Sequence, residues 1–176
     1  MALCPSILTG SQIFLRTLTE KDASEAYARW LNDPEVNRWL ETRRVTVPEL
    51  KTYIREKQES PAALLCGIFW KENGQHIGNV KLEPIDFKKK EATLGIIVGA
   101  RAYWGKGAAT EATNLITDYA FSVLGMQAVT LGVIPENKSA IRVYEKCGFT
   151  VVHTDPKAMN HDGVLYDRCV LRKEAP

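Results

Sequence analysis

The feature that most constrains the fold is a short polar turn, Asn73-Gly74, between two segments that can pair as neighbouring strands. Ala62–Trp70 before the turn is apolar, and His76–Leu82 after it alternates. Asn-Gly favours a two-residue β-hairpin turn, so the two strands are predicted to pair antiparallel. Glu91–Val98 also alternates and follows another polar turn. At least three sequential antiparallel strands are expected, which argues against a doubly wound fold of alternating strands and helices.

The first third of the chain has mainly helical patterns. A short strand at Ile13–Arg16 is followed by Asp22-Ala-Ser-Glu25, a capping-box pattern that predicts the start of a helix. Asn32-Asp33-Pro34 ends that helix, and Asp33 can cap a second, short one. A third helix is predicted from Thr46-Val-Pro-Glu49 to Ser60-Pro61. This region therefore contributes mostly helices to the fold.

The second half begins with the clearest helical pattern, Ala108–Val123, whose apolar residues recur at helical spacing. It is followed by a strand at Gln127–Val133, a helix capped by Asn137 and ended by Gly148, and strands at Phe149–His153 and Val164–Leu171. Strand, helix and strand in succession predict a right-handed crossover. The 176 residues have the length of one domain. We therefore predict an α+β fold, a mixed, mostly antiparallel central sheet flanked by helices, in a single domain over residues 1–176.

Composition narrows the classes of function. The 23 Lys and Arg against 21 Asp and Glu leave a net charge of +2, too balanced for a protein that binds nucleic acid through charge alone. The longest apolar run has nine residues, too few to cross a bilayer, and the first ten residues lack a signal-peptide pattern. Four cysteines and three histidines show no metal-ligand spacing. We expect a cytoplasmic protein with reduced thiols and with no metal, nucleic-acid or membrane partner.

The residues that indicate chemistry lie between the predicted strand Glu91–Val98 and the helix that follows it. Gly105 and Gly107 flank Lys106 there, and alanines come next. Small residues leave the N–H groups of a helix N-terminus open, and these groups with the helix dipole bind phosphate oxygens. The P-loop motif GxxxxGK[ST] is absent, and the dinucleotide-binding motif GxGxxG is not matched because Thr110 stands where its last glycine would be. A phosphate-bearing ligand is indicated, and a flexible turn of small residues is the alternative interpretation.

Three segments of the second half carry a further pattern: Gly105-Lys-Gly-Ala-Ala-Thr-Glu-Ala112, Tyr119-Ala-Phe121, and Asn137-Lys-Ser-Ala-Ile-Arg-Val-Tyr-Glu-Lys-Cys-Gly-Phe149. In this order and spacing they resemble the GNAT N-acetyltransferase superfamily, specifically its RimJ/RimL-like branch. The resemblance covers the element order from about Ile13 to Leu171. It implies that acetyl-CoA lies in a V-shaped gap, where the strands Glu91–Val98 and Gln127–Val133 splay apart.

The resemblance also assigns residues to the cofactor. The pyrophosphate would meet the backbone of the glycine-rich loop, Asn137 would contact the pantetheine arm, and Tyr144 would lie near the sulfur. Amides at the end of the splayed strand would hold the oxyanion that forms on the thioester carbonyl. The cofactor-binding residues expected on this basis are Ile97, Val98, Trp104, Gly105, Lys106, Gly107, Ala108, Ala109, Asn137 and Arg142.

Acetyl transfer from a thioester to an amine requires a neutral amine and a proton for the leaving thiolate. Tyr144 is expected to donate that proton, although a tyrosine on an apolar helix stripe also fits a core residue. No general base is visible, because Thr93 stands where the branch often has glutamate. Glu41, Glu91 or a water chain could serve. Cys147 lies at a helix C-terminus, where the dipole disfavours a thiolate, so direct transfer is favoured over an acetyl-enzyme.

An amine of low pKa is the favoured acceptor, because without a base an α-amine is far more often neutral near neutral pH than a lysine-like amine. A peptide N-terminal α-amine fits, and a nucleotide amino sugar, a polyamine or an aminoglycoside are alternatives. The polar segment 32–44 is expected to cover the acceptor, anchored by Trp39 and Leu40. Glu41 would attract the amine, and Arg43 or Arg44 would meet an anionic group. A non-catalytic acyl-CoA sensor and a homodimer also stay open.

Overall fold

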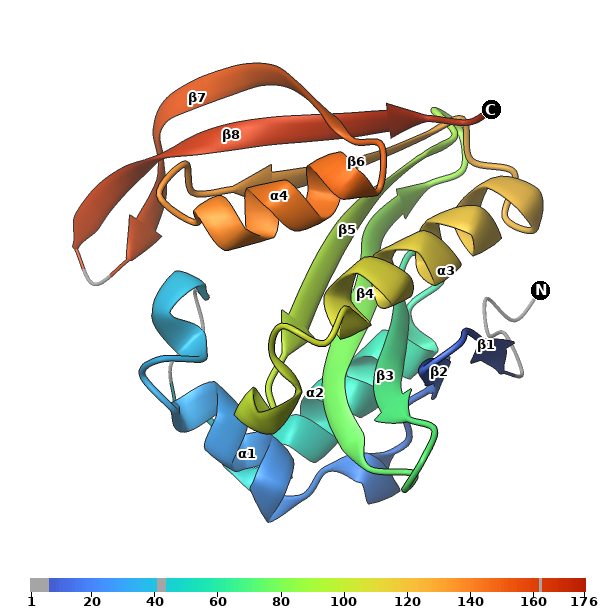
Figure 1. Ribbon diagram of the computed structural model, residues 1–176, viewed down its shortest axis with the longest axis vertical. Helices are drawn as coiled ribbons and strands as arrows, with labels where there is room; N and C mark the ends of the chain where they lie inside the picture. The colour runs from blue at the N-terminus through green and yellow to red at the C-terminus, as the bar shows by residue number, and fades with distance from the viewer. Residues whose placement is uncertain (1–6, 41–43, 162) are drawn as a thin grey trace.

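The structure is a computed structural model that describes residues 7–40, 44–161 and 163–176 (Figure 1). Its strands are β1 (Leu8–Thr9), β2 (Ile13–Thr17), β3 (Leu64–Trp70), β4 (His76–Asp86), β5 (Glu91–Val98), β6 (Ala128–Val133), β7 (Thr150–His161) and β8 (Val164–Glu174). Its α-helices are α1 (Glu25–Asn32), α2 (Val47–Glu59), α3 (Ala108–Ser122) and α4 (Lys138–Lys146). Short 3₁₀ helices are η1 (Glu20–Asp22), η2 (Asn37–Trp39) and η3 (Arg101–Tyr103).

In the described ranges the strands form an eight-stranded sheet in the order β1-β2-β3-β4-β5-β6-β8-β7. Neighbouring strands run antiparallel except β5 and β6, which are parallel and are joined through α3. Figure 1 shows α3 crossing one face of the sheet, with α2 on the other side of it. The mixed, mostly antiparallel sheet predicted from the sequence is confirmed.

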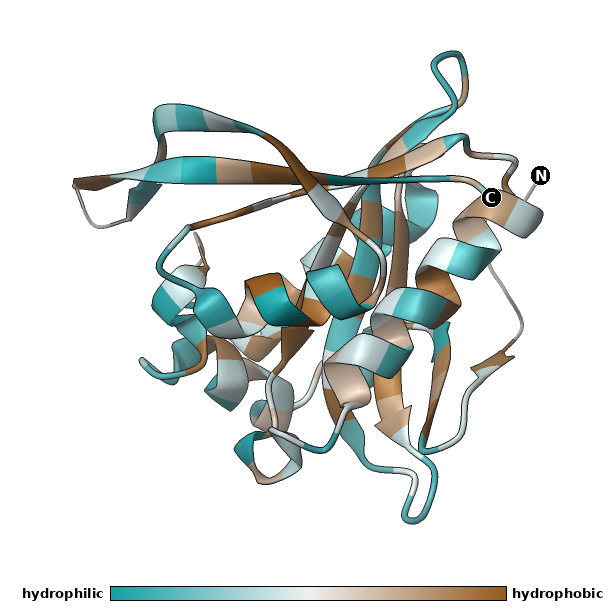
Figure 2. Ribbon diagram, turned by 45° about the horizontal axis from the view of Figure 1, so that its top comes forward, coloured by the Kyte–Doolittle hydropathy of each residue, from teal (hydrophilic) through white to brown (hydrophobic). Residues whose placement is uncertain are grey.

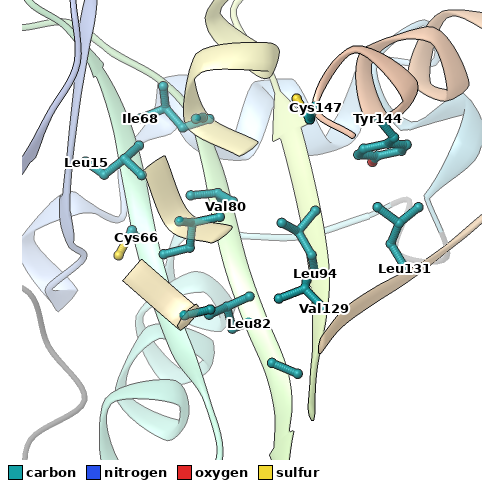
Figure 3. Close-up of a cluster of buried hydrophobic side chains, with 14 of the residues drawn as sticks. Leu15, Cys66, Ile68, Val80, Leu82, Leu94, Val129, Leu131, Tyr144 and Cys147 are labelled. Carbon is teal, nitrogen blue, oxygen red and sulfur yellow. The ribbon is translucent and has the colours of Figure 1, made fainter. Parts of the chain in front are cut away.

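Side chains that alternate along the central strands divide the core into two layers. On one face, Val80, Leu94 and Leu131 belong to a cluster that also includes buried residues of α3 and α4 (Figure 3). On the other face, Leu65 and Phe69 pack with buried residues of α1 and α2. The two helix pairs therefore sit on opposite faces, and the strands between them carry the site described below.

The parallel strands β5 and β6 separate after three paired positions. The pairs are Glu91 with Ala128, Ala92 with Val129, and Thr93 with Thr130. Beyond them, β5 continues along β4 to Val98 and β6 continues along β8 to Val133. The facing edges of the two strands therefore diverge from Leu94 onward, as the predicted splay requires.

The β3–β4 hairpin forms as predicted, but its loop is longer than two residues. Phe69 pairs with His76, and the Trp70 N–H donates to Gln75 O at 2.9 Å, which leaves residues 71–74 as the loop. Gly74 has a φ of 68°, whereas Asn73 does not share the positive φ that a two-residue Asn-Gly turn requires. The Asn73 side-chain oxygen instead accepts from the Gln75 N–H at 3.0 Å, which stabilises the wider loop.

The first two helix starts differ from the prediction, whereas α2 begins after Thr46 as predicted. Thr19 caps η1, and Asp22 is the residue that returns the capping bond. The longer helix α1 is capped instead by Ser24, whose hydroxyl accepts from the Tyr27 N–H at 3.2 Å. The helix predicted after Asp33 is instead a turn followed by η2, although the Asp33 carboxylate makes the expected capping bond by accepting from the Glu35 N–H at 2.9 Å.

The C-terminal strands extend well beyond their predicted ends. β7 continues to His161 and β8 to Glu174, so most of the connection between the two predicted strands is itself strand. The register shifts between Asp155 and Met159, which interrupts the alternation that a sequence reading needs. Figure 2 shows this hairpin projecting from the sheet with many hydrophilic residues. An exposed hairpin of this kind has no buried face to mark its length in the sequence.

The substitution Asp22→Asn should lower stability at neutral pH by about 1 kcal/mol. Two nitrogens of Arg16 contact the Asp22 carboxylate at 2.6 and 2.9 Å, and the Thr19 N–H donates to it at 2.7 Å. Burial alone would raise the pKa of Asp22, but these bonds outweigh burial and lower it. The stabilisation is therefore complete above the unfolded pKa of about 3.9 and is lost as pH falls through the lower folded pKa. Urea unfolding should show the difference from the parent shrinking in acid, and a constant difference would contradict this.

Candidate active site

The open end of β5 presents one backbone amide to the gap between β5 and β6. The N–H groups of Gly99 and Ala100 both donate to Ile77 O, each at 2.9 Å. Backbone groups along an antiparallel strand face the partner and face away in turn, so the Gly99 bond fixes this alternation. It directs the N–H and C=O of Ile97 toward β4 and those of Val98 toward the gap. Of the two residues expected to hold an oxyanion, Val98 is the one whose N–H faces the gap.

The glycine-rich loop needs glycine for its conformation rather than for space. Gly105 and Gly107 have φ values of 74° and 86°. A Cβ on Gly105 would meet nothing within 4 Å, and one on Gly107 would meet only Gln12 Nε2 at 3.6 Å. Residues other than glycine rarely adopt this left-handed backbone conformation. The loop can therefore turn sharply into α3 while its backbone stays uncovered by its own side chains.

The N-terminus of α3 is open to a ligand. Gly107 is the N-cap residue, and no side chain from the described residues caps the helix there. The acidic residue of the first turn, Glu111, accepts from the Ser11 backbone N–H and is thereby held away. Lys106 is exposed, and its ammonium lies 5.1 Å from the ring centroid of Tyr103. An anion at this end would meet N–H groups and the positive end of the helix dipole.

Tyr144 lies beneath α4 and against the diverging strands. The residue is 7% exposed, and Figure 3 shows its ring above Leu94 of β5 and Leu131 of β6. Burial, with a smaller contribution from Cys147, raises the pKa of Tyr144 to about 12. No hydrogen bond joins the Tyr144 hydroxyl to another residue within the part of the chain that the structure describes. It is therefore protonated at neutral pH and available as a donor.

Asn137 caps α4 with the oxygen of its side-chain amide. Its Oδ1 accepts from the Ala140 N–H at 3.3 Å and from the Ser139 hydroxyl at 3.0 Å. The side-chain nitrogen keeps its two donors for another partner. Arg142 is exposed on the outer surface of the same helix. Both residues expected to contact the cofactor from α4 are thus accessible from outside the core.

Cys147 is built into the core rather than exposed for chemistry. Its thiol lies 3.5 Å from Thr110 O in the first turn of α3, and the residue is 4% exposed. Burial raises the pKa of this thiol, and the small lowering by Lys173 does not reverse the shift. A protonated, buried thiol is a poor nucleophile. These features support direct transfer over an acetyl-enzyme.

Of the remaining predicted site residues, Glu91 is not brought to the gap. Glu91 starts β5 at the closed end, where Arg172 contacts its carboxylate at 2.8 Å, roughly 23 Å along the strand from Val98. Glu41 and Arg43 lie outside the described residues. Arg44 is exposed beside Thr46, in a shallow hollow at the start of α2.

The segment before these residues is anchored differently from the prediction. Trp39 and Leu40 are only half-buried, whereas Val36 is 8% and Asn37 is 4% exposed. The Asn37 side chain donates to Leu31 O at 2.7 Å, which ties η2 to the end of α1. A prediction that places apolar residues in the core does not identify a buried asparagine as the residue that anchors this segment.

An aromatic cluster beneath the end of β5 was not anticipated from the sequence. The His76 ring stacks on Phe69 at 4.8 Å and meets Trp30 and Tyr27 edge-on, at 5.0 and 5.4 Å between centroids. Burial lowers the pKa of His76, so its imidazole is neutral at neutral pH. A Cβ on Gly99 would overlap the Trp30 ring, so this glycine lets the indole pack on the strand end. Gly99 is the one feature of the sequence that could have indicated this cluster. The aromatic residues themselves come from separate elements, so no local pattern groups them.

Two contacts of the loop side chains were also missed. The Trp104 indole N–H donates to Val98 O at 2.7 Å. Arg101 contacts Glu35 at 2.6 Å and Asp33 at 3.6 Å, which links the loop to the segment after α1. The first contact ties the glycine-rich loop to the end of β5, and the others tie it to the helical first third.

Neither a metal cluster nor a membrane span is found in the described part of the chain. No three His, Cys, Asp or Glu side chains there are grouped so that they could hold a metal ion. No helix within the same ranges is both long and apolar enough to cross a bilayer. Cys66, Cys147 and Cys169 are buried, and no disulfide joins any two of these three residues.

Comparison of the sequence with models of known protein families shows the family of this chain. The family model described as "Acetyltransferase (GNAT) domain" matches residues 12–150. The chain belongs to the GNAT acetyltransferase family. This match covers the whole β2–α4 region, including the gap and the glycine-rich loop, so the fold and the enzyme class predicted from the sequence are both confirmed.

The relatives that the chain matches include proteins described as N-acetyltransferases. The chain is 35% identical over 121 residues to the probable N-acetyltransferase YjcK of Bacillus subtilis, covering 68% of this chain and 66% of that protein. It is 31% identical over 141 residues to the spermidine N(1)-acetyltransferase of Escherichia coli K12, covering 78% and 72%. A crystal structure of spermidine N-acetyltransferase from Vibrio cholerae in complex with CoA and spermine superposes with a TM-score of 0.85. That structure is 25% identical and covers 94% of this chain and 96% of its own. The GNAT family is thus shown, and the RimJ/RimL-like branch is not singled out.

Proposed function

We propose that this protein transfers the acetyl group of acetyl-CoA to a primary amine, with the cofactor in the gap between β5 and β6. The observation that carries this proposal is the end of β5–β6 pairing at Thr93 and Thr130, beside the open N-terminus of α3. The diverging strands offer a slot for the pantetheine arm, and the helix N-terminus offers amides to the pyrophosphate. The related Vibrio cholerae enzyme was crystallised with CoA, which supports this cofactor.

Each proposed step uses a group whose position has been described. The Val98 N–H would bind the thioester oxygen and stabilise its negative charge as the amine nitrogen attacks the carbonyl carbon. The carbon–sulfur bond then breaks, and the Tyr144 hydroxyl would donate its proton to the departing thiolate. The proton lost by the amine restores the Tyr144 hydroxyl through water, so charges balance. Cys147 takes no part in this direct transfer.

The acceptor we propose first is a peptide N-terminal α-amine. Of the described candidates for a base, Glu91 is ion-paired at the closed end of β5, and His76 is enclosed by aromatic rings and bonded to Asn79 Oδ1 at 2.8 Å. Neither is placed to take a proton from an amine beside Val98. An α-amine, with a reference pKa of about 7.7–8.0, depends least on such a base.

A polyamine is the second candidate acceptor. The observation in its favour is the 31% identity to a spermidine N(1)-acetyltransferase over most of the chain. A polyamine amine resembles lysine in basicity, with a pKa of about 10.4, so its neutral fraction at neutral pH is small. Its use would require a proton path through water or through residues 41–43, which include Glu41.

A screen of CoA thiol release tests both acceptors together. The panel holds a peptide with a free α-amine, the same peptide with a blocked N-terminus, spermidine, a nucleotide amino sugar and an aminoglycoside. For the α-amine, kcat/KM should rise with pH and level off above about pH 8, because the amine is then neutral. For a polyamine the rise should continue toward about pH 10. Binding of acetyl-CoA with no turnover of any amine would favour a non-catalytic sensor.

A further inference from the structure

Trp104 is exposed and yet held in place by two polar contacts. The residue is 44% exposed, which is unusual for tryptophan outside an interface. Its indole N–H donates to Val98 O at 2.7 Å, and the Arg101 guanidinium lies 5.8 Å from the ring centroid. Arg101 is itself fixed by Glu35 at 2.6 Å. The indole therefore has a defined position at the mouth of the gap, although solvent reaches much of its surface.

The Val98 carbonyl oxygen, which accepts the hydrogen bond from the Trp104 indole, faces the gap. The N–H and C=O of one strand residue project toward the same side, so Val98 O lies next to the Val98 N–H. A ligand oxygen that accepts from this N–H would also face the negative end of the Val98 carbonyl dipole. The indole N–H opposes that dipole and satisfies the carbonyl where β6 has already diverged. At the end of β5, the Val98 N–H is therefore free to donate to a ligand, while the Val98 carbonyl oxygen beside it already accepts from Trp104.

We propose that Trp104 is a positioning residue that caps the Val98 carbonyl, so that the Val98 N–H can bind the thioester oxygen of acetyl-CoA without repulsion. This inference rests on the proposed function, because it requires the cofactor to lie in the gap. It assigns a role to the Trp104 side chain, beyond the backbone contact with pyrophosphate expected from the sequence. Arg101 and Glu35 support the same position from the side of the helical first third.

The test compares two ligands that differ at the thioester oxygen. Acetyl-CoA has this oxygen, whereas S-ethyl-CoA has a methylene group in place of the thioester carbonyl group and so lacks the oxygen. The ratio of their dissociation constants, measured by calorimetry, reports the interaction with that oxygen and needs no acceptor amine. In the parent protein acetyl-CoA should bind roughly fivefold more tightly, the size of one net hydrogen bond.

Matched replacements of Trp104 separate the indole N–H from the shape of the side chain. β-(3-Benzothienyl)alanine at position 104 keeps the fused ring and replaces the N–H by sulfur, whereas 5-fluorotryptophan keeps the N–H. The benzothienyl variant and Trp104→Phe should bring the ratio close to one and change the affinity for S-ethyl-CoA less than twofold. The 5-fluorotryptophan variant should keep the parent ratio. Trp70→Phe is the control for the loss of an indole N–H, because that of Trp70 donates to Glu72 at 3.4 Å and not to the Val98 carbonyl.

The outcomes distinguish this inference from the function on which it rests. If neither ligand binds the parent protein, the proposed cofactor site fails. If both ligands bind and the ratio stays at its parent value in the benzothienyl variant, Trp104 does not position the Val98 amide. Equal tightening of both ligands in Trp104→Phe would make the indole an obstruction in the gap and would also overturn the inference. Equal weakening of both would reduce Trp104 to a general contact with the cofactor.

Discussion

Replacing Gly107 with valine should weaken coenzyme A binding by roughly 100-fold, the loss expected when one or two charge-assisted amide–phosphate bonds are removed. Gly107 has a φ of 86° and caps α3. A β-branched residue cannot hold this φ without strain, and its side chain would cover the amides that a phosphate approaches. Calorimetric titration with CoA measures the effect directly.

Gly125→Val is the matched control for this substitution. Gly125 has a φ of 69° with open space around its Cβ position, and it lies beyond the C-terminal end of α3. Both variants should lose stability through the same backbone strain, whereas only Gly107→Val should lose CoA. Equal affinity in the two variants would place the pyrophosphate elsewhere.

Removing the hydroxyl of Tyr144 should have the largest effect on turnover. Tyr144→Phe should lower kcat by about 100- to 10,000-fold, the range expected for a positioned acid, and leave the Kd for acetyl-CoA within twofold. The ring would keep its contact with Phe149, so the fold should be retained. Steady-state kinetics with an amine from the acceptor screen, combined with calorimetry, provide both quantities.

A second tyrosine supplies the control for Tyr144→Phe. Tyr103 is buried to a similar degree, at 8% exposure, and its hydroxyl bonds to Asn73 and Gln75 outside the gap. Tyr103→Phe should therefore cost some stability and leave kcat close to that of the parent. Because burial raises the pKa of Tyr144 to about 12, the parent enzyme should show no loss of rate from tyrosine ionisation below about pH 10. Unchanged kcat in Tyr144→Phe would make this residue part of the core only.

The parts of the fold that the sequence predicts best have strong local signals. The strand Glu91–Val98 has the same bounds in prediction and structure, because a buried face enforces its alternation. The helix α2 begins at the predicted capping box, with Glu49 Oε2 2.7 Å from the Thr46 backbone nitrogen. By contrast, the exposed hairpin β7–β8 extends past its predicted ends, because no buried face marks them.

The geometry of the site depends on contacts between distant segments. The pairing of β5 and β6 ends at Thr93 and Thr130, and no local pattern marks that point, so the splay was expected only from the family resemblance. The bond from Trp104 to Val98 and the contact of Arg101 with Glu35 join separate elements. The sequence therefore offers candidate cofactor-binding residues, whereas the contacts that hold their side chains appear only in the structure.

A crystal structure of this protein with coenzyme A tests the central claim most directly. The account predicts the pyrophosphate on the backbone N–H groups of residues 105–109, the pantetheine arm between β5 and β6, and the sulfur within hydrogen-bond reach of the Tyr144 hydroxyl. A cofactor bound outside the gap, or with its sulfur directed away from Tyr144, would contradict the proposed site and its chemistry.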